Sequence, residues 1–294
     1  MTSFTRKDLI LLAMLTLCWG LNWPIMKIGV REFPPITFRL LGMVGALPVL
    51  WLAARMQNAS LAIPRGKVAA LIKLSVPNMF LWNVLMILGV SMLSSGRAAI
   101  LGYTMPVWAV LSGLLLFGEK LPRLAWCGIL CALAGAMLLL SSEFSQLSGH
   151  PIGSLMVLLA AAFWGYGTVL VKRMPIEMPT ISMTFWLLAF STVPTIALAV
   201  AFESASWRMP SAAEWSAVVY NALIVFGFAQ VVWYRLARNL PPVASSLSVM
   251  MIPVVGVFSG ALMLGETPHW QDYSATVLIV IAMSTIMLKP RRAL

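Results

Sequence analysis

The chain has 294 residues, of which 61% are hydrophobic and 10% are charged, and its mean hydropathy is +0.92. A soluble domain has about 45–50% apolar and about 25% charged residues, so the composition excludes a water-soluble fold and indicates an integral membrane protein. The formal net charge is +11. Because Lys and Arg lie between apolar runs, the positive-inside bias explains this charge, and we expect no nucleic acid partner.

Ten apolar stretches are each long enough to cross the roughly 30 Å hydrocarbon core of a bilayer. Turn-forming residues such as Pro34-Pro35 and Gly149-His150-Pro151 separate them. The expected spans are Leu9–Ile28, Thr37–Met56, Val68–Val90, Ser95–Phe117, Arg123–Leu140, Ile152–Val171, Ile181–Phe202, Glu214–Leu236, Pro242–Leu264 and Asp272–Leu288. The sequence therefore predicts an all-α integral membrane protein with ten transmembrane helices.

Lys and Arg are distributed unevenly between the two sides of the predicted bundle. With the N-terminus inside, the inner segments hold 15 of them and the outer segments hold 5. Cytoplasmic loops carry such an excess, so we expect both termini in the cytoplasm of a multi-pass protein of the bacterial inner membrane.

The second half of the chain repeats the first half in register. Trp19-Gly20 returns as Trp164-Gly165 (164 − 19 = 145), and Gly118-Glu119 returns as Gly265-Glu266 (265 − 118 = 147). The two units, residues 1–144 and 145–294, each contain five predicted helices. An odd number of crossings places the second unit upside down relative to the first, and inverted repeats are typical of transporters with a site between them.

These motifs resemble the drug/metabolite transporter superfamily, specifically its ten-helix EamA-type members. The resemblance rests on the first-helix segment Leu17-Cys18-Trp19-Gly20-Leu21-Asn22-Trp23, its echo Ala162-Phe163-Trp164-Gly165, and the Pro…Gly…Gly-Glu pattern of both halves. It implies two inverted EamA-type repeats and a secondary transporter that exports small metabolites. Four-helix pumps of the superfamily use a Glu in the first helix. Here that helix has Asn22 and no acid, so their proton-coupled mechanism is not carried over.

The sequence shows none of the residue patterns of an enzyme. There is no nucleophile–His pair and no phosphate-binding glycine loop, so we expect no catalytic residue. Glu119 and Glu266 fall at turns, where capping or pairing is the favoured role. The cysteines lack metal-ligand spacing and both histidines, His150 and His269, fall in predicted outer loops, so we also expect no cofactor and no metal.

Polar and aromatic residues within the predicted spans are the candidates for substrate binding. A mid-span amide needs a neighbouring helix, water or a substrate as its partner. The candidates that line a cavity are Trp19, Asn22, Asn78, Trp82, Tyr103, Trp164, Tyr166, Gln230, Ser245 and Ser248. Helix–helix hydrogen bonds and interfacial aromatic belts are the alternative roles, and we assign the belt to Trp51, Trp126, Trp207, Trp215 and Trp270.

Mid-helix prolines are the candidates for hinges, because each removes a backbone hydrogen bond and tends to kink its helix. Two pairs are related by the repeat: Pro48 with Pro194, and Pro106 with Pro253. Symmetric kinks would let half-helices open the cavity alternately, and static curvature is the alternative. For Lys27, Arg39, Arg97 and Lys73, we expect the charged group to reach the membrane interface.

The sequence favours an exporter of small metabolites that works by alternating access, with apolar or aromatic amino acids as its substrates. The alternatives are a drug or other metabolite exporter, with or without proton coupling, and a non-transporting membrane scaffold or enzyme. The expected partners are the small-molecule substrate and the lipid bilayer, with the chain as a monomer or weak homodimer.

Overall fold

The computed structural model describes the backbone of residues 6–119, 123–145, 149–233 and 242–287, with side chains for 10–119, 123–142, 149–233 and 250–285. Regular structure in these ranges is entirely helical, as the sequence predicts. The first half contains α1 (Arg6–Gly29), α2 (Pro35–Met56), α3 (Val68–Ser75), η1 (Val76–Leu81), α4 (Trp82–Met92), α5 (Ser95–Gly102), α6 (Met105–Phe117) and α7 (Arg123–Ser145). The second half contains α8 (Pro151–Arg173), α9 (Thr180–Glu203), η2 (Ser204–Ser206), α10 (Ala212–Tyr220), η3 (Asn221–Ala229), α12 (Pro242–Leu264) and α13 (Trp270–Met287).

Eight helical runs in the described part of the chain are long and apolar enough to cross a membrane. They match the first eight predicted spans to within a few residues; the sixth, for example, is Pro151–Arg173. The apolar helices α12 and α13 follow at the ninth and tenth predicted positions. Large apolar side chains such as Phe202 and Leu262 are exposed on the bundle surface, where a bilayer would solvate them.

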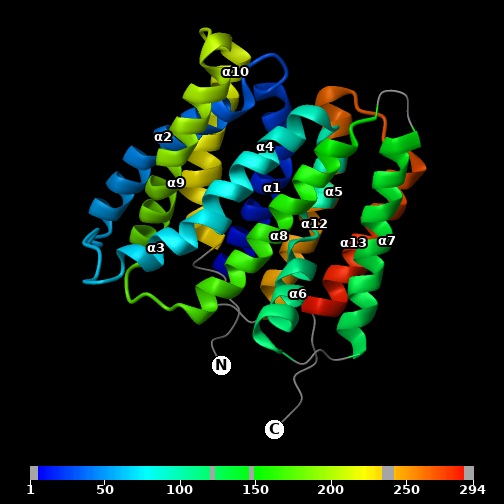
Figure 1. Ribbon diagram of the computed structural model, residues 1–294, viewed down its shortest axis with the longest axis horizontal. Coiled ribbons are helices and arrows are strands. Elements are labelled where there is room, and N and C mark those ends of the chain that lie inside the picture. The colour runs from blue at the N-terminus through cyan, green and yellow to red at the C-terminus, as the bar shows by residue number, and fades with distance from the viewer. Residues whose placement is uncertain (1–5, 120–122, 146–148, 234–241, 288–294) are drawn as a thin grey trace.

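Helices that are equivalent in the two halves pack against equivalent partners. α1 lies against α12, and α8, the counterpart of α1, lies against α6. α2 packs on α9 and α7 packs on α13, so these pairs join the second and the fifth helices of the two halves. Figure 1 shows α2 and α9 together at the left and α7 beside α13 at the right. The first turn of α1 and the last turn of α13 lie at the same end of the bundle.

The repeated glycines after Trp19 and Trp164 allow two close helix contacts. A Cβ on Gly20 would lie 2.3 Å from Val255 Cγ1, and one on Gly165 would lie 2.6 Å from the backbone nitrogen of Ala109. Helices in a bilayer gain little from the hydrophobic effect when they associate, so their contacts depend on close packing at small residues. Gly20 therefore sets the spacing of α1 and α12, and Gly165 that of α8 and α6.

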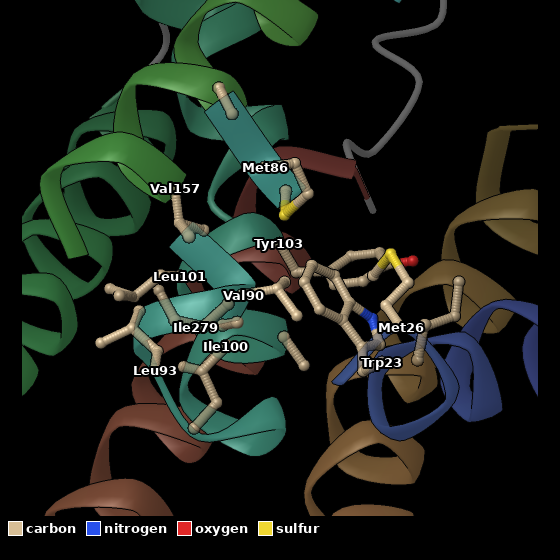
Figure 2. Packing of buried hydrophobic residues seen from close by; sticks show 14 of the residues in the cluster. Trp23, Met26, Met86, Val90, Leu93, Ile100, Leu101, Tyr103, Val157 and Ile279 are labelled. Carbon is tan, nitrogen blue, oxygen red and sulfur yellow. The ribbon is translucent and has the colours of Figure 1, made fainter. Parts of the chain in front are cut away.

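The larger buried apolar cluster gathers side chains from α1, α4, α5, α8, α12 and α13. Figure 2 shows its centre, where Trp23 and Met26 of α1 face Tyr103 at the end of α5. A second cluster joins α2, α3 and α9. Both clusters draw on both halves of the chain, so neither half has a separate core.

Two π-helical segments, η1 and η3, begin 145 positions apart in the two halves (221 − 76 = 145). A π-turn disturbs the ladder of hydrogen bonds between residues four apart and is frequent at functional sites. Asn78 Nδ2 donates to Leu74 O at 2.9 Å, and Asn221 Nδ2 donates to Ala217 O at 3.0 Å. Each side-chain amide thus donates to a carbonyl four residues earlier, near the start of its π-segment.

Both Gly-Glu pairs end a helix in the same way. Gly118 and Gly265 have φ of +66° and +67°, a left-handed conformation that glycine adopts without strain. Glu119 and Glu266 then donate their backbone N–H to the carbonyl six residues earlier, at 3.0 and 3.4 Å. Gly118 and Gly265 also donate their own N–H to the carbonyl four residues earlier, as in the αL motif of a helix C-terminus, and each Glu side chain lies back beside its own helix.

The paired prolines differ between the halves in one respect. Pro48, Pro194 and Pro253 lie inside α2, α9 and α12, as expected. The mid-helix position predicted for Pro106 is wrong, because α5 ends at Gly102 and Pro106 lies in the first turn of α6. Proline is well tolerated there, since the first N–H groups of a helix have no intrahelical partner.

Candidate functional site

The first group of predicted cavity residues lies where η1 and α4 face α8. The indole rings of Trp82 and Trp164 have centroids 5.0 Å apart and are tilted by 53°. Asn78 is buried one turn before Trp82, and its amide lies so close to α8 that a Cβ on Gly167 would be 2.5 Å from Asn78 Cγ. The structure therefore brings Asn78, Trp82 and Trp164 together across the two halves.

The second group lies where α1 faces the end of η3. The rings of Trp19 and Trp233 have centroids 5.6 Å apart. Asn22 and Gln230 are buried on the same two helical runs. Trp19 and Trp164 are repeat counterparts. Each of them contacts a tryptophan from the third helical run of the opposite half, Trp233 and Trp82 respectively. Trp233 was outside the predicted set, although it follows Gln230 by less than one helical turn.

Tyr103 lies beside Trp23, with ring centroids 6.1 Å apart in an edge-on arrangement (Figure 2). The close approach depends on Gly102, where a Cβ would lie 2.6 Å from the Trp23 ring. Trp19 and Trp82 pack against the same apolar cluster as this pair. Tyr103 and both tryptophan groups therefore border the same apolar cluster.

The other predicted residues fall into three kinds. Tyr166 on α8 is half-buried and joins neither tryptophan group. Ser245 and Ser248 belong to α12, but their side chains lie outside the described residues. The five tryptophans assigned to the belt are 40–65% exposed, as that assignment requires: Trp51, Trp126, Trp207, Trp215 and Trp270.

Two of the four cations expected to reach the interface point inward instead. Arg39 on α2 is 3% exposed and donates from Nη1 to Asn221 Oδ1 at 3.0 Å. Arg97 on α5 is 6% exposed and forms an ion pair with Asp272, its Nε 2.8 Å from Oδ1. Lys73 is exposed, as expected. The sequence could not reveal the inward cases, because the partners lie 182 and 175 positions away.

Two carboxylates bind helix N-termini at the end of the bundle opposite the start of α1. Glu266 accepts hydrogen bonds from Ser95 N at 2.6 Å and from Gly96 N at 3.2 Å, at the start of α5. Glu203 accepts from Ile36 N and Thr37 N, at 2.9 and 2.6 Å, at the start of α2. The first N–H groups of a helix carry partial positive charge, so both carboxylates are well placed. The capping role predicted for Glu266 is confirmed.

A hollow of about 300 Å³ opens beside the Glu266 contact. Arg97, Asp272 and both histidines line it, and His150 and His269 are exposed as the sequence predicts. In the loop before α10, Arg208 donates hydrogen bonds to the Glu214 carboxylate, and this interaction raises the pKa of Arg208. In the described part of the chain, no three His, Cys, Asp or Glu side chains are grouped to hold a metal ion.

Glu119, the counterpart of Glu266, has a different partner. Its carboxylate lies 2.6 Å from Arg173 Nη2 at the end of α8, and the two side chains are 52% and 41% exposed. The Arg173 guanidinium also covers the Phe117 ring, 4.1 Å from its centroid. The expected pairing of Glu119 is confirmed, and the two ends of the bundle differ: one carboxylate caps a helix of the other half while its counterpart lies in an exposed ion pair.

The sequence profile of the EamA-like transporter family matches residues 7–141 and again residues 151–288. The chain belongs to the EamA-like transporter family. A solved crystal structure superposes on it with a TM-score of 0.67 over 97% of this chain and 98% of the other. At 20% identity, that likeness shows a common fold for this EamA-like transporter.

Curated relatives of this EamA-like transporter cover most of its length. It is 30% identical to the uncharacterized transporter YoaV of Bacillus subtilis, over 85% of this chain and 86% of that one. It is 28% identical to the uncharacterized inner membrane transporter YedA of Escherichia coli, over 93% and 88%. It is 22% identical to a probable amino-acid metabolite efflux pump of Escherichia coli, over 95% and 94%. The chain is thus a multi-pass transporter of the bacterial inner membrane.

Proposed function

We propose that this EamA-like transporter exports small metabolites, with apolar and aromatic amino acids as its leading substrates, by alternating access between two inverted repeats. The observation that carries the proposal is the matched pair of tryptophan contacts, Trp19 with Trp233 and Trp164 with Trp82. Each contact joins the two halves, and each uses one member of the repeated Trp-Gly motif. A substrate held between these contacts would meet both halves.

The proposed topology has ten membrane helices, with residues 1–144 and 145–294 as the repeats and both termini in the cytoplasm. The family profile matches twice, once in each half, which supports the division. The first turn of α1 and the last turn of α13 share one end of the bundle, as an even number of crossings requires (Figure 1). An odd number of crossings in each half makes the repeats inverted.

Alternating access is supported by the differences between equivalent parts. Pro106 begins a new helix after a break, whereas Pro253 lies within a continuous one. Glu266 caps α5 of the other half, whereas Glu119 is paired at the surface. If the two halves exchange conformations, the opposite arrangement has similar energy and opens the cavity to the other side.

The proposed substrate class follows from the side chains at the two tryptophan contacts and the buried amides beside them. Indole rings supply broad apolar surfaces and attract an ammonium group through cation–π contact, and buried amides supply hydrogen bonds. The relative from Escherichia coli described as a probable amino-acid metabolite efflux pump supports this class. Partnership with a small-molecule substrate and the bilayer, as a monomer or weak homodimer, belongs to the same proposal.

The test is uptake of a panel of labelled amino acids into proteoliposomes, without an imposed ion gradient, by the wild type and by Trp164→Ala. We expect saturable uptake of a few apolar or aromatic amino acids and its loss in the variant. Uptake that begins only with a pH gradient would indicate proton coupling instead. No uptake under either condition would move the assignment to a drug or other metabolite exporter.

A further inference from the structure

The loop that joins α2 to α3, together with the helix ends beside it, carries four exposed basic side chains. We call residues 55–73 the basic segment, and its cations are Arg55, Arg65, Lys67 and Lys73. None of the four takes part in an ion pair within the described part of the chain. Their charges are also unopposed along the sequence, because no Asp or Glu occurs between Glu32 and Glu119.

The loop of the basic segment is held against α9. Trp186 Nε1 donates to Leu61 O at 2.7 Å, and Ser182 Oγ donates to Ser60 O at 2.8 Å. Leu61 and Ile63 pack against the second apolar cluster. Figure 1 shows the loop at the left edge of the bundle, between the ends of α2 and α3. Because its backbone is already fixed, the loop loses less conformational entropy on binding a partner than a free loop would.

Exposed apolar side chains adjoin these cations on both helices. Along α3 and into η1 they are spaced four residues apart, so they share one face, and they are 40–46% exposed: Val68, Ile72 and Val76. On α2, the Arg55 guanidinium carbon lies 5.2 Å from the centroid of the Trp51 ring, which is itself 45% exposed. Cations that adjoin an apolar face at the end of a membrane span lie at the level of the lipid headgroups.

The four cations are not part of the repeated architecture. Pro34 returns as Pro179 at an offset of 145 (179 − 34 = 145). Pro48 returns as Pro194 at an offset of 146 (194 − 48 = 146). At either offset the equivalents of the four cations are uncharged: Val200 or Ala201, Pro210 or Ser211, Ala212 or Ala213, and Val218 or Val219. The second half thus folds without charge at these positions, so a partner at one end of the bundle explains the cations better than a structural role does.

Neighbouring loops do not neutralise the basic segment. The loop between α8 and α9 packs against the same apolar cluster as Leu61, and it brings Lys172 and Glu177, both exposed, whose formal charges cancel. The cation of the equivalent loop in the second half, Arg208, is by contrast paired with Glu214. The basic segment therefore presents unpaired positive charge at an exposed surface.

We propose that the basic segment binds the headgroups of anionic phospholipids, with their acyl chains on the face formed by Val68, Ile72 and Val76. The phosphate oxygens accept charge-assisted hydrogen bonds from the Arg and Lys side chains. A lipid fits because it joins negative charge to apolar chains, as the segment joins cations to an apolar face. A soluble phosphate matches only the charge. Such binding is independent of which solute the protein carries.

The test is native mass spectrometry of the purified full-length chain in a neutral detergent, titrated with phosphatidylglycerol or with phosphatidylcholine of the same acyl chains. Only phosphatidylglycerol carries a net negative charge. Each Lys or Arg beside an anionic lipid strengthens binding about fivefold, so we expect the wild type to prefer phosphatidylglycerol by at least about twentyfold. Glycerophosphoglycerol, the headgroup without acyl chains, should not displace the lipid in large excess, because it cannot contact the apolar face.

Two variants test the segment one cation at a time. Arg65→Gln and Lys67→Gln should each weaken the binding of phosphatidylglycerol about fivefold and leave that of phosphatidylcholine unchanged. Both side chains are exposed, so both variants should fold. Arg31→Gln is the matched control, because Arg31 is an exposed arginine in the loop between α1 and α2, at the opposite end of α2. It should change neither affinity.

Three results would overturn the proposal. Equal binding of the two lipids by the wild type would show that headgroup charge is not recognised. An equal loss in Arg31→Gln and Arg65→Gln would show a diffuse attraction to the net positive charge of the chain instead of a site at the α2–α3 loop. Displacement of the lipid by glycerophosphoglycerol would identify a soluble phosphodiester as the occupant. Each of these results leaves the proposed export standing, because the tryptophan contacts are not involved.

Discussion

The indole rings of Trp82 and Trp164 lie 5.0 Å apart, one on the third helical run of the first half and one on the first helix of the second half. The same relationship recurs between Trp233 and Trp19, with the halves exchanged. These two contacts are the described places where the repeated Trp-Gly motif meets an aromatic residue of the opposite half. A solute moving between the halves would disturb both.

Trp82→Ala should lower the transport efficiency, kcat/KM, for an aromatic amino acid by about tenfold, because aromatic pairs contribute roughly 0.5–1.5 kcal/mol beyond their buried area. Trp126→Ala is the matched control, since Trp126 is 47% exposed on α7. Initial rates in proteoliposomes with equal protein incorporation measure both variants. Equal rates for the two variants would remove Trp82 from the binding surface.

Glu266→Gln should lower the free energy of unfolding by about 2–3 kcal/mol, because a charged acceptor is lost from the N-terminus of α5. Glu119→Gln, the same change at the equivalent position, should cost less than about 1 kcal/mol because its ion pair with Arg173 is exposed. Denaturant unfolding in detergent micelles compares the two. A larger loss for Glu119→Gln would show that the carboxylate contacts are assigned to the wrong ends.

Gly165→Ala should separate α8 from α6, because the new Cβ would lie 2.6 Å from the backbone nitrogen of Ala109. Backbone cannot give way cheaply, so we expect a loss of about 1–3 kcal/mol of stability. Gly135→Ala in α7 is the control. Its Cβ would have no neighbour closer than 3.4 Å, so the gain in helix propensity should leave this variant as stable as the wild type or about 0.5–1 kcal/mol more stable. Thermal unfolding of both variants checks the contrast.

Transport should not depend on a pH gradient. Every Asp and Glu whose side chain is described lies at a helix end or in a loop, as Glu203 and Glu266 do, so the middle of the described spans has no carboxylate that could carry a proton. Uptake rates with equal and unequal pH across the proteoliposome membrane should agree, with a protonophore as control. A rate that collapses when the protonophore is added would contradict facilitated transport.

The sequence predicts the helices well and their partners poorly. Boundaries are marked locally, as at Gly118, where a left-handed residue ends α6, and at Pro151, where α8 begins. No residue type marks the π-segments η1 and η3, because a widened turn within a continuous apolar run does not change the pattern of hydrophobic residues. Arg39 points inward and donates to Asn221, which lies 182 positions later in the chain. No residue near position 39 indicates that partner.

In the candidate site, too, the sequence indicates some residues and not their contact partners. Trp19 and Trp164 could be found from the repeat alone, because a motif that recurs in inverted halves lies at their common interface. Trp233 could not, since its counterpart in the first half is not aromatic. The pairing of Glu266 with α5 is also invisible in the sequence, since the partner Ser95 lies 171 positions earlier.

The most direct measurement is counterflow of labelled L-phenylalanine into proteoliposomes preloaded with unlabelled L-phenylalanine. An alternating-access exporter exchanges solute across the membrane, so the wild type should accumulate label transiently and Trp164→Ala should not. Label that enters preloaded and empty vesicles equally, in both proteins, would contradict carrier-mediated amino-acid transport by this chain.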